Sequence, residues 1–172
     1  DSYLFLDANR MGMRIGEKGI DCIPIAYGIS EKGQFEVLSI GLCHSESNRS
    51  WGNFVHDLKA RGLKDPLLCI SDGNPGVINA IESICPTSYR QRCVKHKMEN
   101  VLDAIPQDQH PEIRKKLNRI FYGATTLEQA KMAFRDFKQE FQHPYPSAVS
   151  RLETDLDQCI TYYLFPPKHW KR

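Results

Sequence analysis

The sequence predicts an α/β fold, in which a mixed β-sheet flanked by helices is followed by an all-helical region. Three observations carry this prediction. Strand-like apolar runs dominate the first half of the chain, helical periodicity interrupts them twice, and almost everything after Lys97 is helical in pattern. With 172 residues, 41% of them hydrophobic, the chain is long enough to bury a sizeable core.

Three apolar runs predict consecutive strands over residues 3–8, 20–30 and 35–44. The loop between the second and third runs is short and contains Gly33, which is typical of a hairpin. Pro24 lies inside the second run. Because proline donates no hydrogen bond to a neighbouring strand, it favours an edge position or a bulge there.

The first helix is predicted by an apolar stripe at i, i+3, i+4 and i+7, formed by Trp51, Phe54, Val55 and Leu58, and is expected to end near Gly62. The almost wholly apolar run 66–71 then predicts a strand buried on both faces. Asn74 and Pro75 suit the N-cap and first position of a second helix, which ends before Pro86. Residues 89–94 predict a fifth strand.

Helical stripes fill the rest of the chain. They end at Pro106, at Phe121 and at Phe141, and a last single helix is expected from Ala148 to Ile160. No apolar run approaches the roughly 20 residues that a membrane span requires. The six cysteines are expected to be reduced and intracellular, because the chain is long for a disulfide scaffold and no secretory leader is visible. The net charge of +2 says little about partners.

Two aspartates stand at the ends of apolar strands. Asp7 ends the first run, and Asp72 follows the buried fourth strand. A carboxylate against a core is costly unless it is compensated, and a divalent cation can compensate two at once. Both residues would also suit ordinary turns, so each taken alone says little.

The order of the elements makes this pair more informative. Three antiparallel strands, a helix, a fourth strand, a helix and a fifth strand is the order of the ribonuclease H-like fold. In that fold the first and fourth strands are neighbours, so Asp7 and Asp72 are expected side by side. Two such carboxylates with a pair of hard cations would form a phosphoryl-transfer site.

A basic cluster follows the second helix. Four of the eight residues from Arg90 to Lys97 are basic and none is acidic. It is either a solvated strand edge or a strip that binds phosphates, with Arg90, Arg92, Lys95 and His96 as its members. Cys93 and His96 could also ligate zinc, although a closed site needs four ligands, for which Cys85 and His44 are the remaining candidates.

An ordered set of segments resembles the bacterial insertion-sequence transposases of the Mutator superfamily over essentially the whole chain. The segments are Tyr3-Leu-Phe-Leu-Asp-Ala8, Glu46-Ser-Asn-Arg-Ser-Trp51, Asp57-Leu-Lys-Ala-Arg-Gly-Leu63, Ile70-Ser-Asp-Gly73, Gln91-Arg-Cys-Val-Lys-His96, Ile120-Phe-Tyr122, Tyr145-Pro146, Phe165-Pro166 and His169-Trp-Lys-Arg172.

The resemblance implies a ribonuclease H-like catalytic domain with an Asp-Asp-Glu triad that binds two Mg²⁺ ions, for which Mn²⁺ would substitute. Asp7 and Asp72 match the two aspartates, and Cys93 with His96 matches a Cys-x-x-His signature. The glutamate is expected just beyond Arg172, so Glu99, Glu140 and Glu153 are not assigned to it. On this basis, residues 1–97 are the first part of the catalytic core and 98–172 a helical insertion, with an N-terminal DNA-binding region and the glutamate helix outside this sequence.

The function implied is cleavage of transposon ends and transfer of the 3'-hydroxyl strand to target DNA, with a fragment that is inactive alone. The expected partners are transposon-end and target DNA and, in the full protein, further copies of the same chain; no membrane partner is expected. The expected location is the bacterial cytoplasm, at the nucleoid. The alternatives are a non-catalytic DNA-binding or regulatory module of the same fold, and a zinc-stabilised structural domain.

Overall fold

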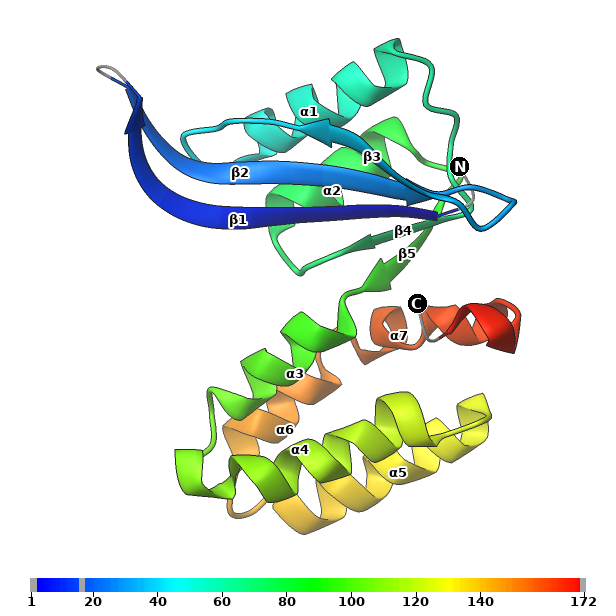
Figure 1. The fold of residues 1–172 in the computed structure, drawn as a ribbon. Helices are drawn as coiled ribbons and strands as arrows, with labels where there is room; N and C mark the ends of the chain where they lie inside the picture. The colour runs from blue at the N-terminus through cyan, green and yellow to red at the C-terminus, as the bar shows by residue number, and fades with distance from the viewer. Residues whose placement is uncertain (1–2, 16–17, 171–172) are drawn as a thin grey trace. The chain divides into compact units, whose positions relative to one another are not determined.

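A computed structural model describes residues 3–15 and 18–170 (Figure 1). The chain divides into two compact units, Asp1–Gln91 and Arg92–Arg172. Each unit is described by itself below. The final two residues of the predicted motif at 169–172 lie outside the described residues.

The first unit is built on a five-stranded mixed sheet with the order β3-β2-β1-β4-β5. The strands are β1 (Tyr3–Ile15), β2 (Lys18–Ile29), β3 (Phe35–Ile40), β4 (Leu68–Ser71) and β5 (Tyr89–Arg92). The pairs β1–β2 and β2–β3 are antiparallel, whereas β1 and β4 are parallel. The predicted strands and the adjacency of the first and fourth are therefore confirmed. The hairpin is confirmed as well, with Gly33 in the left-handed region at φ 76°.

Of the two alternatives for Pro24, the edge position is wrong, because β2 lies between β1 and β3. The pairing of β2 with β3 does contain an irregularity nearby, between Ala26 and Tyr27. The carbonyl of Pro24 accepts a hydrogen bond from the Gly41 N–H at 2.8 Å, one residue beyond the last β3 partner, Ile40. The N and C=O of one strand residue point to the same side, so the missing N–H of Pro24 faces the β3 side. It removes one hydrogen bond between the Ile25–Ile40 pair and the Cys22–Cys43 bridge, where the same register continues. The proline thus costs the β1–β2 ladder nothing.

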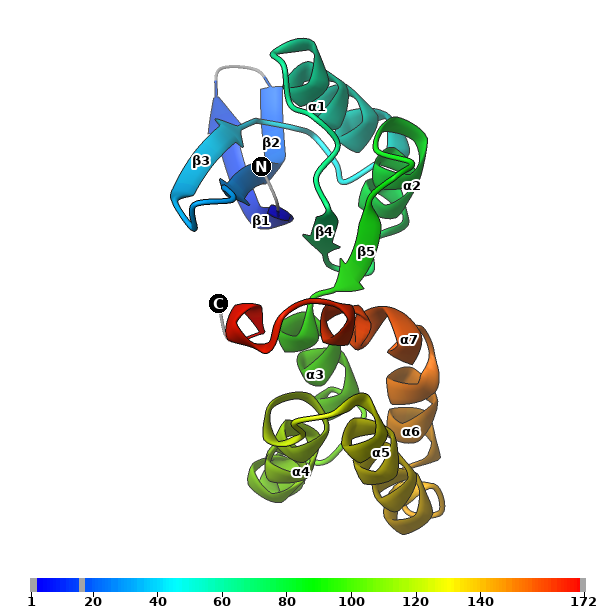
Figure 2. The same ribbon diagram turned by 90° about the vertical axis from the view of Figure 1, so that its right-hand side faces the viewer.

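Two helices, α1 (Asn48–Ala60) and α2 (Pro75–Ile84), pack on one side of the sheet (Figure 2). The second helix begins as predicted, because the Asn74 side chain caps α2 by accepting from the Gly76 N–H at 2.7 Å. The Ser47 side chain caps α1. The core between helices and sheet is formed by Leu4, Leu6, Ala26, Trp51, Val55, Leu58, Cys69, Val77, Ala80, Ile81 and Cys85.

The other face of the sheet presents a row of apolar side chains. Phe5, Tyr27 and Phe35 stack across β1, β2 and β3, with ring centroids 4.7 and 5.0 Å apart. Phe35 is mostly exposed, and Phe5 and Tyr27 are half-buried. Because strand side chains alternate between faces, Asp7 lies on this same face, two residues after Phe5.

The second unit is helical, as predicted. It contains α3 (Val94–Leu102), α4 (His110–Asn118), α5 (Leu127–Phe141), α6 (Pro146–Glu153) and α7 (Leu156–Cys159), with short turns of 3₁₀ or π-helix between and after them. Its core is formed by residues including Met98, Val101, Leu102, Ile113, Leu117, Ile120, Phe121, Phe137, Leu152 and Cys159. Within the described residues, no helix combines the length and the apolar character needed to cross a membrane.

The single last helix predicted from Ala148 to Ile160 is wrong. Asp155 has a φ of 52° and separates α6 from α7. The apolar stripe continues across the break, so its spacing alone does not reveal it. The cause is tertiary: the freed carbonyl of Thr154 and the carboxylate of Asp155 both accept hydrogen bonds from the buried Lys97.

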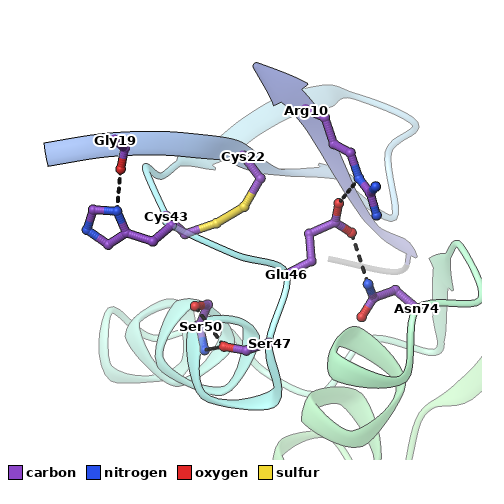
Figure 3. The surroundings of a disulfide bond; sticks show 9 residues. Arg10, Gly19, Cys22, Cys43, Glu46, Ser47, Ser50 and Asn74 are labelled. Atoms are coloured by element: carbon purple, nitrogen blue, oxygen red, sulfur yellow. Dashed lines mark hydrogen bonds and ion pairs between the residues drawn. A yellow bond between two sulfur atoms is a disulfide. The ribbon is translucent and has the colours of Figure 1, made fainter. Parts of the chain in front are cut away.

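The expectation that all six cysteines are reduced is also wrong in this structure. Cys22 of β2 and Cys43 form a disulfide across 21 residues (Figure 3). Cys69, Cys85, Cys93 and Cys159 are free. Hydrogen bonds between the two cysteine backbones, at 2.9 and 3.1 Å, hold the segment after β3 against β2 beside the disulfide.

Candidate functional site

Asp7 and Asp72 occupy adjacent positions where the pairing of β1 with β4 stops. Asp72 follows the end of β4, whereas Asp7 lies inside β1, which continues to Ile15 and pairs Asp7 with Ile25 of β2. The expectation that Asp7 ends its strand is therefore wrong. The last residues paired between the parallel strands β1 and β4 are Leu6 and Ser71, and the two aspartates are the next residue on each chain. Both are half-buried. Carboxyl ends of neighbouring parallel strands are the usual location of ligands in such sheets.

Neither carboxylate is neutralised by a basic side chain in the part of the chain that the structure describes. One oxygen of Asp7 accepts from the Ala8 N–H, and one of Asp72 from the Asn74 N–H, each at 2.9 Å. The remaining oxygen lone pairs are hard donors of the kind that Mg²⁺ and Mn²⁺ prefer. The two residues thus fit a divalent cation as part of its ligand set.

No third ligand joins them within residues 3–15 and 18–170, since no group of three His, Cys, Asp or Glu side chains there could hold a metal ion. The other acids considered from the sequence have local partners instead. Glu99 pairs with Arg114, Glu140 with Lys116 and Glu153 with Lys138. The hydrogen bond from Arg114 holds the pKa of Glu99 below its ordinary value.

Glu46 also belongs to this site, although the sequence pattern alone indicates no role for it. It lies two residues before α1, and its side chain is 11% exposed. Its Oε2 accepts from Asn74 Nδ2 at 3.1 Å and its Oε1 from Arg10 Nε at 3.0 Å (Figure 3). One indication of its position is visible in the sequence: Glu46 is an acid directly before the helix-capping Ser47, within one of the segments that carry the resemblance.

A glycine allows the segment of Glu46 to approach α2. A Cβ on Gly76 would lie 2.9 Å from the Glu46 carbonyl oxygen and 2.9 Å from the Ser47 carbonyl carbon. Both are backbone atoms, which cannot rotate away, so any side chain at Gly76 would push the two segments apart. The N-termini of α1 and α2 therefore meet directly beside Asp72.

The four residues of the predicted basic strip have different surroundings. Arg90, in the first unit, pairs with Glu82 at 3.3 Å. Arg92, in the second, has a side chain only 8% exposed and pairs with Asp155 at 3.4 Å. Lys95 is exposed, and His96 is half-buried, with a buried Nδ1 that has no hydrogen-bond partner among the described residues.

Lys97, the last residue of that basic run, is buried. Its side chain is 3% exposed, and its Nζ donates to the Arg151 carbonyl at 2.6 Å, the Thr154 carbonyl at 2.7 Å and Asp155 Oδ1 at 2.5 Å. All three hydrogen positions of the ammonium group are thereby used. Lys97 therefore joins α3 to the break between α6 and α7, and it is unavailable to a phosphate.

The Cys-x-x-His pair gains no further ligand among the described residues. Cys93 is half-buried and His96 lies one turn along the chain from it. Cys85 is in the first unit, where it is buried against Cys69, and His44 hydrogen-bonds the Gly19 carbonyl. Burial, and secondarily the nearby Cys93, raises the pKa of Tyr122.

Comparison with known proteins gives a consistent result. The model of a family described as "Transposase, Mutator family" matches residues 2–172. The chain is 33% identical over 168 residues to the transposase for insertion sequence element IS6120 of Mycolicibacterium smegmatis, covering 98% of this chain and 51% of that protein. It is 34% identical over 157 residues to the transposase for IST2 of Acidithiobacillus ferrooxidans, covering 91% of this chain and 53% of that protein. The chain thus spans about half the length of these curated relatives.

Proposed function

Because this chain belongs to the Mutator family of transposases, we propose that it is part of a ribonuclease H-like catalytic domain of the Asp-Asp-Glu type. The domain would cleave DNA at transposon ends and transfer the 3'-hydroxyl strand to target DNA. The observation that carries the proposal is the placement of Asp7 and Asp72 side by side, directly after the last pair of the parallel strands β1 and β4, with no cation to neutralise them in the described residues.

Asp7 and Asp72 would hold the divalent cations, Mg²⁺ or Mn²⁺. When bound, such ions neutralise charge on the transferring phosphoryl group and orient the attacking and leaving oxygens. In the second unit, Lys95 and His96 would bind phosphates of the DNA, since Arg92 is committed to Asp155. The full protein would act as an oligomer, because two transposon ends must be joined to one target.

We propose that the third acid belongs to a part of the protein outside this sequence, and that this chain alone cleaves DNA poorly. The relatives are about twice as long, and the described residues bring no third acid to the pair.

The lack of a third acid among the described residues also favours the second candidate, a DNA-binding module without catalysis. A labelled transposon-end duplex separates the two. Cleavage should appear only with a chain extended by a few dozen residues, and robust cleavage by residues 1–172 would contradict the proposed missing acid.

The metal site is tested by titrating residues 1–172 with Mn²⁺ in a calorimeter. Asp7→Asn and Asp72→Asn should each lower the affinity by at least about tenfold, because each removes a charged oxygen ligand. Asp57→Asn is the matched control: this acid lies on α1 and pairs with Arg61 at the surface, so the affinity should not change. Equal Mn²⁺ binding by all four proteins would refute the catalytic proposal and leave the DNA-binding module.

A further inference from the structure

We propose that Glu46 is a positioning residue, which fixes the loop of Asp72 through the side chain of Asn74 and so keeps that carboxylate ready to bind a cation. This inference rests on the metal site proposed above. It concerns a residue that touches neither the cation nor the DNA.

The chain of contacts is short and complete. Glu46 Oε2 accepts from Asn74 Nδ2 at 3.1 Å, and the backbone N–H of Asn74 donates to Asp72 Oδ1 at 2.9 Å. The other end of the Asn74 amide, Oδ1, accepts from the Gly76 N–H at 2.7 Å. With an acceptor on one side and a donor on the other, the amide has one orientation only. Asn74 is therefore clamped between Glu46 and the first turn of α2.

Glu46 is itself held by a rigid segment. Three residues earlier, Cys43 is bonded to Cys22 of β2, and His44 contacts the Gly19 carbonyl (Figure 3). One residue later, Ser47 begins α1 by accepting from the Ser50 N–H at 3.2 Å. The absence of a side chain at Gly76 lets this segment lie against α2. Because the chain is anchored on both sides of Glu46, the carboxylate of Glu46 has a fixed position and can hold Asn74 in place. A residue on a free loop could not do this.

The contacts of Glu46 favour a positioning role over direct metal binding. Both oxygens of Glu46 are already occupied, one by Asn74 and one by Arg10. No group of three acids, histidines or cysteines in the described residues is arranged to hold a metal. Residues that orient a ligand in this way typically change metal affinity by 10–100-fold when they are replaced.

The test combines two variants with opposite expectations. Glu46→Ala removes the acceptor for Asn74 and should weaken Mn²⁺ binding by about tenfold. Glu46→Gln keeps an oxygen for Asn74 and should bind Mn²⁺ within about threefold of the wild type, because only the charge facing the exposed Arg10 is lost. Loss of binding in Glu46→Gln equal to that in Asp72→Asn would show that Glu46 is a direct ligand and would overturn the proposal.

Asn74→Ser tests the relay, by which we mean the contacts from Glu46 through Asn74 to Asp72. Serine still caps α2 but has no amide to donate to Glu46. We expect it to weaken Mn²⁺ binding as much as Glu46→Ala does, and the double variant to be no weaker than either single one, since both break the same contact. Additive losses would mean that the two residues act separately and would refute the relay.

A readout without metal separates this inference from the proposed function. Hydrogen exchange of the Asn74 backbone amide, which donates to Asp72, should be about tenfold faster in Glu46→Ala than in the wild type or in Asp57→Asn. If Asp7→Asn and Asp72→Asn leave Mn²⁺ binding unchanged, the metal site fails, whatever the exchange shows. If those two abolish binding while Glu46→Ala changes neither affinity nor exchange, the metal site stands and the positioning role fails.

Discussion

One charged cluster in each unit provides a contrast: the cluster in the first unit has no basic partner, and the cluster in the second is paired. In the first unit, Asp7 and Asp72 lie side by side on adjacent strand segments with no basic partner among the described residues. In the second, two buried cations, Arg92 and Lys97, share the carboxylate of Asp155. A compensated network stabilises a fold only while every member is present. An uncompensated pair contributes no such stability and is available to a ligand. Substitutions at the two clusters should therefore change the free energy of unfolding in opposite directions.

The largest effect is expected from Lys97→Ala. It leaves the Asp155 carboxylate and two carbonyls without their shared donor, and breaking a buried pair in this way costs about 3–5 kcal/mol of unfolding free energy. Urea denaturation measures the change. Lys138→Ala, at a largely exposed pair with Glu153, should cost about 0.5 kcal/mol or less. Similar losses of unfolding free energy in the two variants would show that the buried network stabilises the protein no more than the surface pair does.

The first unit has a covalent link in place of such a network. Replacing both Cys22 and Cys43 by serine should lower the unfolding free energy by about 3 kcal/mol under oxidising conditions, because the open chain gains the entropy of a loop of this length. Urea denaturation with and without dithiothreitol measures this. The reductant should destabilise the wild type to the level of the variant and leave the variant unchanged. A wild type insensitive to the reductant would show that the bond does not form in solution.

In contrast to the substitutions above, Asp7→Asn and Asp72→Asn should stabilise the protein when metal is absent. Each variant keeps the oxygen that accepts from the backbone and removes one of two neighbouring like charges. We expect the unfolding free energy in EDTA to rise by up to about 1 kcal/mol, the usual exchange of function for stability at a site. A loss of more than about 1 kcal/mol in either variant would show that the wild-type carboxylate is compensated after all.

The smallest effect concerns Asp65, a paired acid of the first unit. Hydrogen bonds from Lys59 and then from Thr87 hold the pKa of Asp65 below its ordinary value. Its contribution to stability is therefore complete above the unfolded pKa of about 3.9 and is lost as the pH falls through the lower folded value.

Asp65→Asn should cost about 0.5 kcal/mol at pH 6, a small amount because the pair is partly exposed. The difference from the wild type should shrink toward zero near pH 2.5. Urea denaturation of both proteins at the two pH values measures this. A difference that does not depend on pH would contradict the pairing.

Sequence pattern predicted those features that depend on local periodicity and chain order. The strands, the two capped helices and the neighbourhood of Asp7 and Asp72 all follow from apolar spacing and topology. The extension of β1 to Ile15 was missed because residues 9–12 are exposed and show no apolar alternation. Features decided by distant partners could not be predicted at all: the pairing of Cys22 with Cys43, and the contact of Glu46 with Asn74.

The break at Asp155 has a consequence for which sequences this fold can accept. A backbone with φ of 52° is tolerated mainly by glycine, asparagine and aspartate, whereas the charges of Arg92 and Lys97 require a carboxylate. Aspartate is the one amino acid that meets both demands. Among randomised libraries screened for folded protein, position 155 should therefore be among the least variable, although it belongs neither to an apolar stripe nor to the proposed metal site.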